Sequence, residues 1–150
     1  MHEVNKVVAR LLDGSVIKGA SADFFPNRSS FHVHEAGAGA AAEVLCERLK
    51  AVFFVKDLAG NSQRQDAQGF PASPAALAAG KKIAVRFKDG ELICGYTLAY
   101  TPDRSGFFMT PSDPASNNIR IYVLTHATKQ VGVGPKAEQM AQAKTPPRAA

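Results

Sequence analysis

An internal repeat is the feature that most constrains how this chain can fold. Residues 24–30 read FFPNRSS, and residues 100–106, which lie 76 positions later, read YTPDRSG. Self-similarity at a fixed period is typical of proteins built from repeated units. Aligning residues 6–31 with residues 82–107 gives ten identities in 26 positions without a gap, at Lys6/Lys82, Arg10/Arg86, Asp13/Asp89, Gly14/Gly90, Ile17/Ile93, Gly19/Gly95, Pro26/Pro102, Arg28/Arg104, Ser29/Ser105 and Phe31/Phe107. A second match at a spacing of 79 pairs Val44, Leu45, Lys50 and Val52 with Val123, Leu124, Lys129 and Val131.

The hydrophobic pattern within each copy has the period of a β-strand. Ile83, Val85 and Phe87 alternate with Lys, Ala and Arg, which is typical of a half-buried strand. An Asp-Gly pair falls between the first two strands of each copy, where a tight hairpin needs residues that tolerate positive φ. A glycine in the middle of each second strand suits a sharp bend or a close approach of another backbone. We expect strands near residues 5–12, 15–24, 30–35, 43–48 and 50–56, and near 82–88, 91–100, 106–110, 119–125 and 127–132.

These strands predict an all-β protein with two tandem, five-stranded, Sm-like or SH3-like small barrels. The first barrel is expected in residues 1–56 and the second in residues 81–131. Residues 57–80 form the linker, in which the segment SPAALAAG at 73–80 carries the cap signals of a short helix. Residues 132–150 have little apolar content and are predicted to be a flexible tail.

Composition limits the class of protein and its location. The net charge is +5, but the basic residues are spread along the chain, so charge alone favours nucleic acid only modestly. No apolar run reaches the roughly 18 residues that span a bilayer, and the start lacks the pattern of a signal peptide. We therefore expect a cytoplasmic protein without a membrane partner. Cys46 and Cys94 lie far apart in apolar segments, which favours two buried thiols over a disulfide.

The arginines of the echoed corner are the main candidate binding residues. Arg28 and Arg104 each follow a proline-shaped turn, and a guanidinium held there offers a fork that suits a carboxylate or a phosphate. The alternative is that the prolines only shape the corner and that each arginine pairs with a local acid or carbonyl. The candidate ligand-binding or partner-binding residues are Arg28, Arg104, Asn27, Asp103, Phe25 and Tyr100.

The segment AVFFV at residues 51–55 indicates a strand that is covered on both faces. An alternating strand hides one face only, so an apolar run on both faces needs a second layer. That layer is either the other barrel of the same chain or the edge of another chain. Self-association into a homo-oligomer therefore stays open, and a ring of six barrels would need three chains.

The order of strands, turn, mid-strand glycine and corner resembles the Sm-like barrel of the Sm, LSm and bacterial Hfq families. Asp23 and Asn27 lie at the spacing of the DxxMN motif of these families, in which the Asn contributes to a nucleotide pocket, and Pro26 stands in place of the Met. The second copy has Ala99 and Asp103 at these positions. The resemblance implies a small barrel in each copy and RNA as a ligand. The pair of copies also resembles uncharacterised bacterial proteins in which such units accompany regulatory domains.

Catalytic and metal-binding patterns are absent from the sequence. It contains no Gly-rich phosphate loop, nucleophile elbow or paired-carboxylate motif, and His32 and His34 have no carboxylate or Cys at a convincing ligand spacing. We expect no enzyme activity, no metal and no cofactor. The leading prediction is a non-catalytic binding or assembly module, a bacterial intracellular regulator or adaptor that binds a protein partner or itself. The alternative is an RNA-binding or single-stranded DNA-binding protein of the Sm/Hfq-like type.

Overall fold

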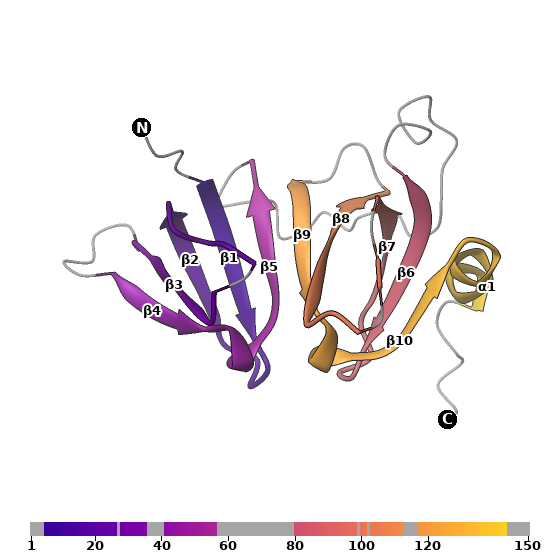
Figure 1. The fold of residues 1–150 in the computed structure, drawn as a ribbon, viewed down its shortest axis with the longest axis horizontal. Coiled ribbons are helices and arrows are strands. Elements are labelled where there is room, and N and C mark those ends of the chain that lie inside the picture. The colour runs from indigo at the N-terminus through magenta and orange to yellow at the C-terminus, as the bar shows by residue number, and fades with distance from the viewer. Residues whose placement is uncertain are drawn as a thin grey trace.

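The computed structural model describes residues 5–26, 28–35, 41–56, 80–98, 100–101, 103–112 and 117–143. Figure 1 shows a fold made mostly of strands, which confirms the all-β prediction. The strands are β1 (Asn5–Leu11), β2 (Val16–Ser21), β3 (Ser30–Val33), β4 (Ala42–Leu45), β5 (Leu49–Val55), β6 (Lys81–Phe87), β7 (Leu92–Thr97), β8 (Gly106–Pro111), β9 (Asn118–Leu124) and β10 (Thr128–Val133). The helical elements of the described residues are the 3-10 turns η1 (Cys46–Arg48) and η3 (Thr125–Ala127) and the α-helix α1 (Pro135–Ala143).

The predicted strands agree with the observed strands to within three residues at each end. The largest differences are at the ends of β2, β4 and β7, which stop three residues early. At β4 the reason is η1, a 3-10 turn that the alternating pattern does not reveal. The predicted linker helix at residues 73–80 lies outside the described residues, apart from Gly80.

Two halves, residues 5–56 and 80–133, have the same order of strands. Eight antiparallel strands form one sheet in the order β10-β6-β7-β8-β9-β5-β1-β2, and β3 pairs with β4 in a second sheet. A single bridge between Ala20 and His34 links β2 to β3, so β5-β1-β2-β3-β4 corresponds to β10-β6-β7-β8-β9. The described strands do not close into a barrel in either half. Instead, the fifth strand of the first half, β5, pairs with the fourth strand of the second half, β9.

Equivalent strands also share local irregularities. Lys50 is the extra residue of a β-bulge in β5 against β1, and Lys129 is the extra residue of the corresponding bulge in β10 against β6. A side chain at Gly19 would clash with the carbonyl oxygen of His34, and a side chain at Gly95 would clash with a carbonyl of β8. The close approach expected at both mid-strand glycines is therefore confirmed.

Strands β5 and β9 form a partition between two hydrophobic cores. The core of the second half takes three residues from β5 and two from β9, namely Ala51, Phe53, Val55, Ile121 and Val123. The core of the first half takes the residues on the opposite face of the same strands, namely Leu49, Val52, Phe54, Tyr122 and Leu124. The AVFFV segment is therefore covered by the other half of the same chain, and the second layer that its pattern required is intramolecular.

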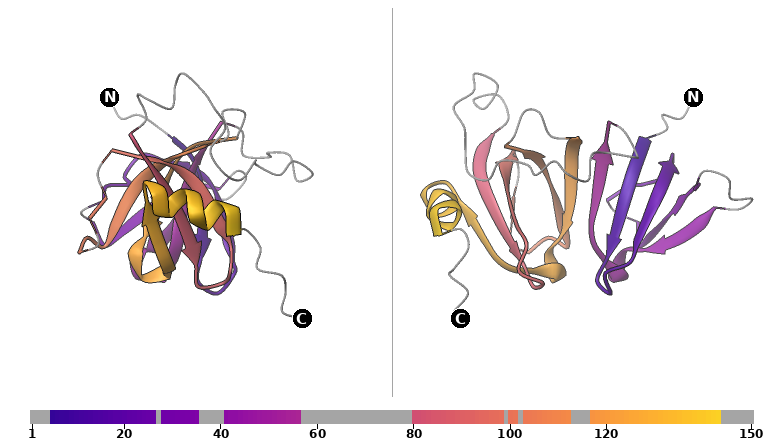
Figure 2. Two further views of the ribbon diagram at one scale, coloured as in Figure 1. Left: turned by 90° about the vertical axis from the view of Figure 1, so that its right-hand side faces the viewer. Right: turned by 180° about the vertical axis from the view of Figure 1, so that it is seen from behind.

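Helix α1 corrects the prediction of a flexible tail at residues 135–143, and the remainder of that predicted tail, residues 144–150, lies outside the described residues. Pro135 occupies the first helical position, and Ala137, Met140 and Ala141 are buried against a surface of β6 and β7 that includes Cys94. Figure 2 shows the helix lying across the outer side of the second half. The average composition of residues 132–150 does not reveal this helix, because only three of its residues form the buried stripe. No helix of the described residues is long and apolar enough to span a membrane.

Candidate functional site

The first echoed corner, between β2 and β3, is fixed by hydrogen bonds of Asp23. The Asp23 carboxylate accepts the backbone N–H of His32 at 2.9 Å and lies 2.7 Å from His32 Nδ1. The Ser21 hydroxyl donates to it at 3.3 Å. Desolvation raises the pKa of Asp23, but the hydrogen bonds from His32 outweigh it and leave the pKa below its ordinary value. The loop that carries Phe25 and Arg28 is thus tied to β3.

The backbones of the two candidate arginines are held in the same way. The Arg28 carbonyl accepts a hydrogen bond from the Cys46 thiol at 3.5 Å, and the Arg104 carbonyl accepts one from the Thr125 hydroxyl at 2.7 Å. The N–H of Arg28 closes a turn onto the carbonyl of Phe25 at 2.9 Å. The backbone of each corner is therefore held by a side chain that follows the fourth strand of its half.

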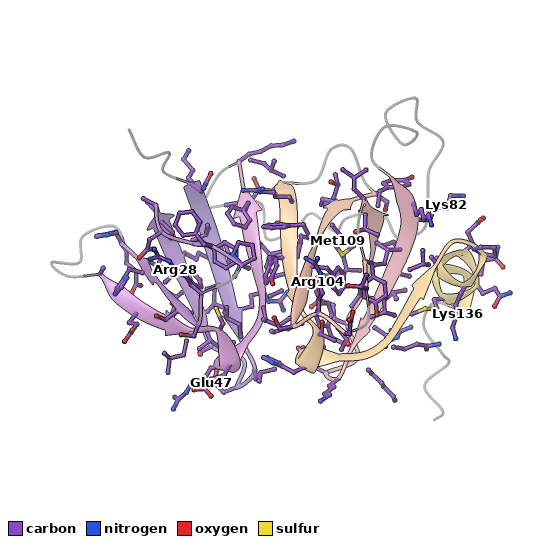
Figure 3. All side chains as sticks on the ribbon, viewed as in Figure 1. Arg28, Glu47, Lys82, Arg104, Met109 and Lys136 are labelled. Carbon is purple, nitrogen blue, oxygen red and sulfur yellow. The ribbon has the colours of Figure 1, made fainter. Side chains whose placement is uncertain are left out.

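The arginine side chains have a different environment from their backbones. Both Arg28 and Arg104 are exposed, and Figure 3 labels Arg28 on the first half and Arg104 on the second. The Arg28 guanidinium lies over the ring of Phe25, 5.1 Å from its centroid, and Phe25 is 46% exposed. Within the described residues neither guanidinium forms an ion pair. The local acid of the structural alternative is thus not found there.

An aromatic cluster lies next to these corners and joins the two halves. The ring centroid of Phe24 lies 4.9 Å from that of Phe31, 5.6 Å from that of Phe54, 6.4 Å from that of Phe108 and 5.3 Å from that of Tyr122, all in edge-to-face geometry. Phe108 and Tyr122 come from the second half, so the second half completes the core of the first. Of the Phe24-Phe25 pair, Phe24 therefore packs inside and Phe25 remains available at the surface.

Arg120 is a candidate that the sequence reasoning missed. Its guanidinium lies 4.4 Å from the ring centroid of Phe54 and 4.7 Å from that of Phe108, and the residue is exposed. Arg120 lies opposite Phe54 in the pairing of β9 with β5. The sequence shows only a charged residue in an alternating strand, because Phe54 reaches Arg120 through the pairing of β5 with β9 and Phe108 reaches it from β8.

Tyr122 connects the cluster to the second corner. Burial raises the pKa of its hydroxyl, and the nearby Cys46 raises it further, while a hydrogen bond with Ser105 and the charge of Arg104 lower it. The charge of Arg104 is thus close enough to the Tyr122 hydroxyl to lower its pKa. We call Arg28, Arg104, Arg120, Phe25 and the cluster beside them the arginine–aromatic surface.

The remaining predicted site residues fall into different environments. Tyr100 is partly buried and packs edge to face on Phe107 at 4.8 Å, against the second core. Asp103 is exposed in the second corner. Asn27, the residue that the Sm-like motif assigns to a nucleotide pocket, lies outside the described residues.

A second charged cluster contrasts with the arginines because its charges are paired. Lys50 is buried, and its Nζ lies 2.7 Å from a carboxylate oxygen of Asp89, in hydrogen-bond contact with Glu91, and 4.6 Å from the ring centroid of Phe87. Arg10 of β1 forms a further ion pair with Glu91 at 3.0 Å. These contacts clamp the β6–β7 hairpin to the first half, so we assign them a structural role.

Metal ligands are not gathered in the part of the chain that the structure describes. No group of three or more His, Cys, Asp or Glu side chains there is placed to hold a metal ion. His32 and His34, the pair at i and i+2, are both exposed, and His32 is engaged with Asp23.

Comparison with known proteins gives one family. Neither the curated proteins nor the solved structures include a match to this chain. Residues 3–134 match the model of a protein family described as "Family of unknown function (DUF6982)". The matched range contains both halves and the arginine–aromatic surface, and helix α1 lies beyond it. The chain therefore belongs to DUF6982, a family of unknown function.

Proposed function

We propose that this protein is a non-catalytic binding module that recognises an anionic segment of a partner protein on the arginine–aromatic surface. The observation that carries the proposal is the set of three exposed arginines, Arg28, Arg104 and Arg120, which form no ion pair within the described residues. A guanidinium presents a planar fork of donors that matches carboxylates and phosphates. In contrast, the buried Lys50 is already neutralised by Asp89 and Glu91.

The state of the aromatic rings favours a protein partner over nucleic acid. Base stacking needs ring faces that are open to the ligand. Phe54 is 3% exposed and Tyr122 is 5% exposed, and their neighbours meet them edge to face. The buried rings therefore pack beneath the arginine side chains and offer no open faces. Within the described residues, Phe25 is the one large exposed ring of the arginine–aromatic surface.

Binding of a fluorescent polyglutamate peptide tests this proposal. We expect the peptide to bind the full chain in a salt-dependent manner, and the triple change Arg28→Ala, Arg104→Ala, Arg120→Ala to weaken binding at least about tenfold, which is about 1.4 kcal/mol. The matched control is Lys18→Ala, Arg48→Ala, Lys88→Ala, which removes the same charge from exposed positions elsewhere. Equal losses in both triple variants would reduce the effect to net charge and contradict the proposal.

Single-stranded RNA is the second candidate ligand, and the stacked pair of Phe25 and Arg28 favours it. An exposed ring with a guanidinium at 5.1 Å is a contact that single-stranded nucleic acids use. Under this candidate, mixed-sequence RNA should bind with an affinity that falls linearly with the logarithm of salt concentration. Phe25→Ala should then weaken RNA binding more than peptide binding, because only a base stacks on the ring. Tight RNA binding without peptide binding would replace the first proposal.

We also propose that the two halves derive from one Sm-like unit and that the protein acts as a regulator or adaptor. The shared strand order, the equivalent bulges at Lys50 and Lys129 and the equivalent glycines at positions 19 and 95 support this origin. An experimental structure in which the β-bulge of β10 is missing, or in which β3 does not follow β2 in space, would argue against it.

A further inference from the structure

Strand β10 is the second-half equivalent of β5, but its outward face has a different neighbour. In β5, Ala51 and Phe53 point away from the first core and enter the second core. A spacing of 79 places Gln130 and Gly132 at these positions in β10. Gln130 is exposed, whereas Gly132 is buried.

Helix α1 is the element that covers Gly132. A Cβ atom there would lie 2.6 Å from the sulfur of Met140 and 2.7 Å from Cγ of Lys136, so the helix uses the space that a side chain would fill. Ala84 is the equivalent of Val8. Val8 packs against the core of the second half, and Ala84 is fully buried in the cluster that α1 forms with β6 and β7. Helix α1 therefore covers the face of the second half that is equivalent to the face of the first half covered by the second half.

We propose that α1 is a displaceable cap over a surface that accepts the first half of a second copy of this chain. The junction inside the chain favours this occupant, because the same strand pairing can continue between copies. Strand β4 is the equivalent of β9, and β10 is the equivalent of β5. In the described residues, β4 and β10 each pair with one strand only. Pairing β10 of one chain with β4 of another would therefore repeat the β5–β9 junction between copies.

Charge complementarity at the hairpin supports the same occupant. Within the chain, Lys50 meets Asp89 in the turn of the β6–β7 hairpin. Their equivalents are Lys129 and Asp13, which are both exposed. In the proposed contact, the turn of the β1–β2 hairpin from one copy brings Asp13 to Lys129 of the other copy.

Two features prevent the contact between β10 of one copy and β4 of another in the full chain. The first is α1, whose contacts in the described residues include a short buried stripe and an ion pair between Lys82 and Glu138 at 3.3 Å. A nine-residue helix is marginal without such packing. The second is Glu43, which stands where β9 has Tyr122 and would carry a carboxylate into an apolar core. The chain is therefore a monomer while α1 is in place, and association after its displacement is weak.

The test combines thiol labelling with light scattering on the full chain. Cys94 lies beneath α1 and is 5% exposed, so in a Cys46→Ser background its labelling rate reports whether the helix has lifted. We expect Ala137→Asp with Met140→Asp to raise that rate at least tenfold and to give a mass above the monomer that increases with concentration. Adding Glu43→Tyr should lower the concentration for half-association at least tenfold. Adding Asp13→Lys should reverse the association.

Several results would overturn the proposal. Fast Cys94 labelling in a chain that stays monomeric even with Glu43→Tyr would show that the surface accepts no second copy. Association that Asp13→Lys does not reduce would indicate non-specific contact of exposed apolar residues. If the double Asp variant unfolds, Glu138→Lys offers a milder route through the Lys82 ion pair, and protection of Cys94 in that variant would show that α1 is not displaceable. Because α1 and the arginine–aromatic surface share no residue, peptide binding by the arginines is a separate readout.

Discussion

Strands β5 and β10 occupy equivalent positions in the two halves but have opposite environments. Both contain a bulge lysine, yet Lys50 is 4% exposed and engaged by two carboxylates, whereas Lys129 is exposed. Every residue of β5 is buried, while β10 is buried only at Gly132. The difference arises because β5 has the second half as a neighbour and β10 has a short helix. The environment of a position in a repeated unit is thus set by what lies beside the unit.

The two echoed corners differ in a related way. The first corner places His32 at the surface, where it contacts Asp23. The second half has Phe108 at the position of His32, and this ring reaches into the aromatic cluster of the first half. The position thus packs against the other half in the second half and lies at a polar surface in the first half.

The largest expected difference between the halves is at Phe54 and its equivalent, Val133. Phe54→Ala removes a ring that is 3% exposed and packed between the halves, so the free energy of unfolding should fall by about 3–5 kcal/mol. Val133→Ala, at the partly buried position of β10, should cost about 1 kcal/mol. Urea unfolding of both variants measures the difference. Similar losses would mean that β5 is no more central to the fold than β10.

The next largest effect is expected when the buried lysine loses its carboxylates. Asp89→Ala with Glu91→Ala leaves the ammonium of Lys50 buried without a charged partner, which should cost about 3 kcal/mol. The equivalent change in the first half, Asp13→Ala with Ser15→Ala, should cost much less because, within the described residues, Asp13 accepts hydrogen bonds from exposed Ser15 and forms no ion pair with a buried lysine. Thermal unfolding at neutral pH compares the two. A larger loss for the Asp13 and Ser15 pair would argue against the clamp between the halves.

The smallest expected effect is the pH dependence that Asp89 contributes. Burial raises the pKa of Asp89, but the hydrogen bonds from Lys50 and from the backbone of Glu91 outweigh it and hold the pKa below its ordinary value of 3.8. A carboxyl with a lowered pKa stabilises the fold above its ordinary pKa, and that stability is lost as the pH falls through the lower value. Because the side chain is 55% exposed, we expect a contribution below about 1 kcal/mol.

Acid titration of the unfolding free energy for the wild type and for Asp89→Asn measures this contribution. The variant should be slightly less stable at neutral pH and should lose less stability on acidification. Asp13 and Asp23, whose pKa values are also lowered, stay in both proteins and provide the common background. Parallel titration curves would show that the Lys50 contact does not affect the ionisation of Asp89.

Most of the strand positions could be predicted from the sequence, but the candidate site could be predicted only in part. Alternation and the Asp-Gly turns located the strands because side-chain period and turn geometry are local properties. Arg28, Arg104 and Phe25 were identified from the echoed corner, and they do lie at the surface. Arg120 was missed because its significance comes from Phe54 and Phe108, which reach it through strand pairing and packing. Helix α1 was missed because a stripe of three buried residues does not change average composition.

The sequence by itself determined the approximate positions of the ten strands and the need of β5 for two covering layers, since these follow from the period and polarity of neighbouring residues. Only the tertiary structure decided that β5 pairs with β9, that the halves share a partition instead of closing separately, and that α1 covers the outer face of β10. The physical reason is that several segments of the sequence could form hydrogen bonds with an unpaired strand edge or bury an apolar face equally well. Which partner occupies them depends on contacts between residues that are far apart along the chain.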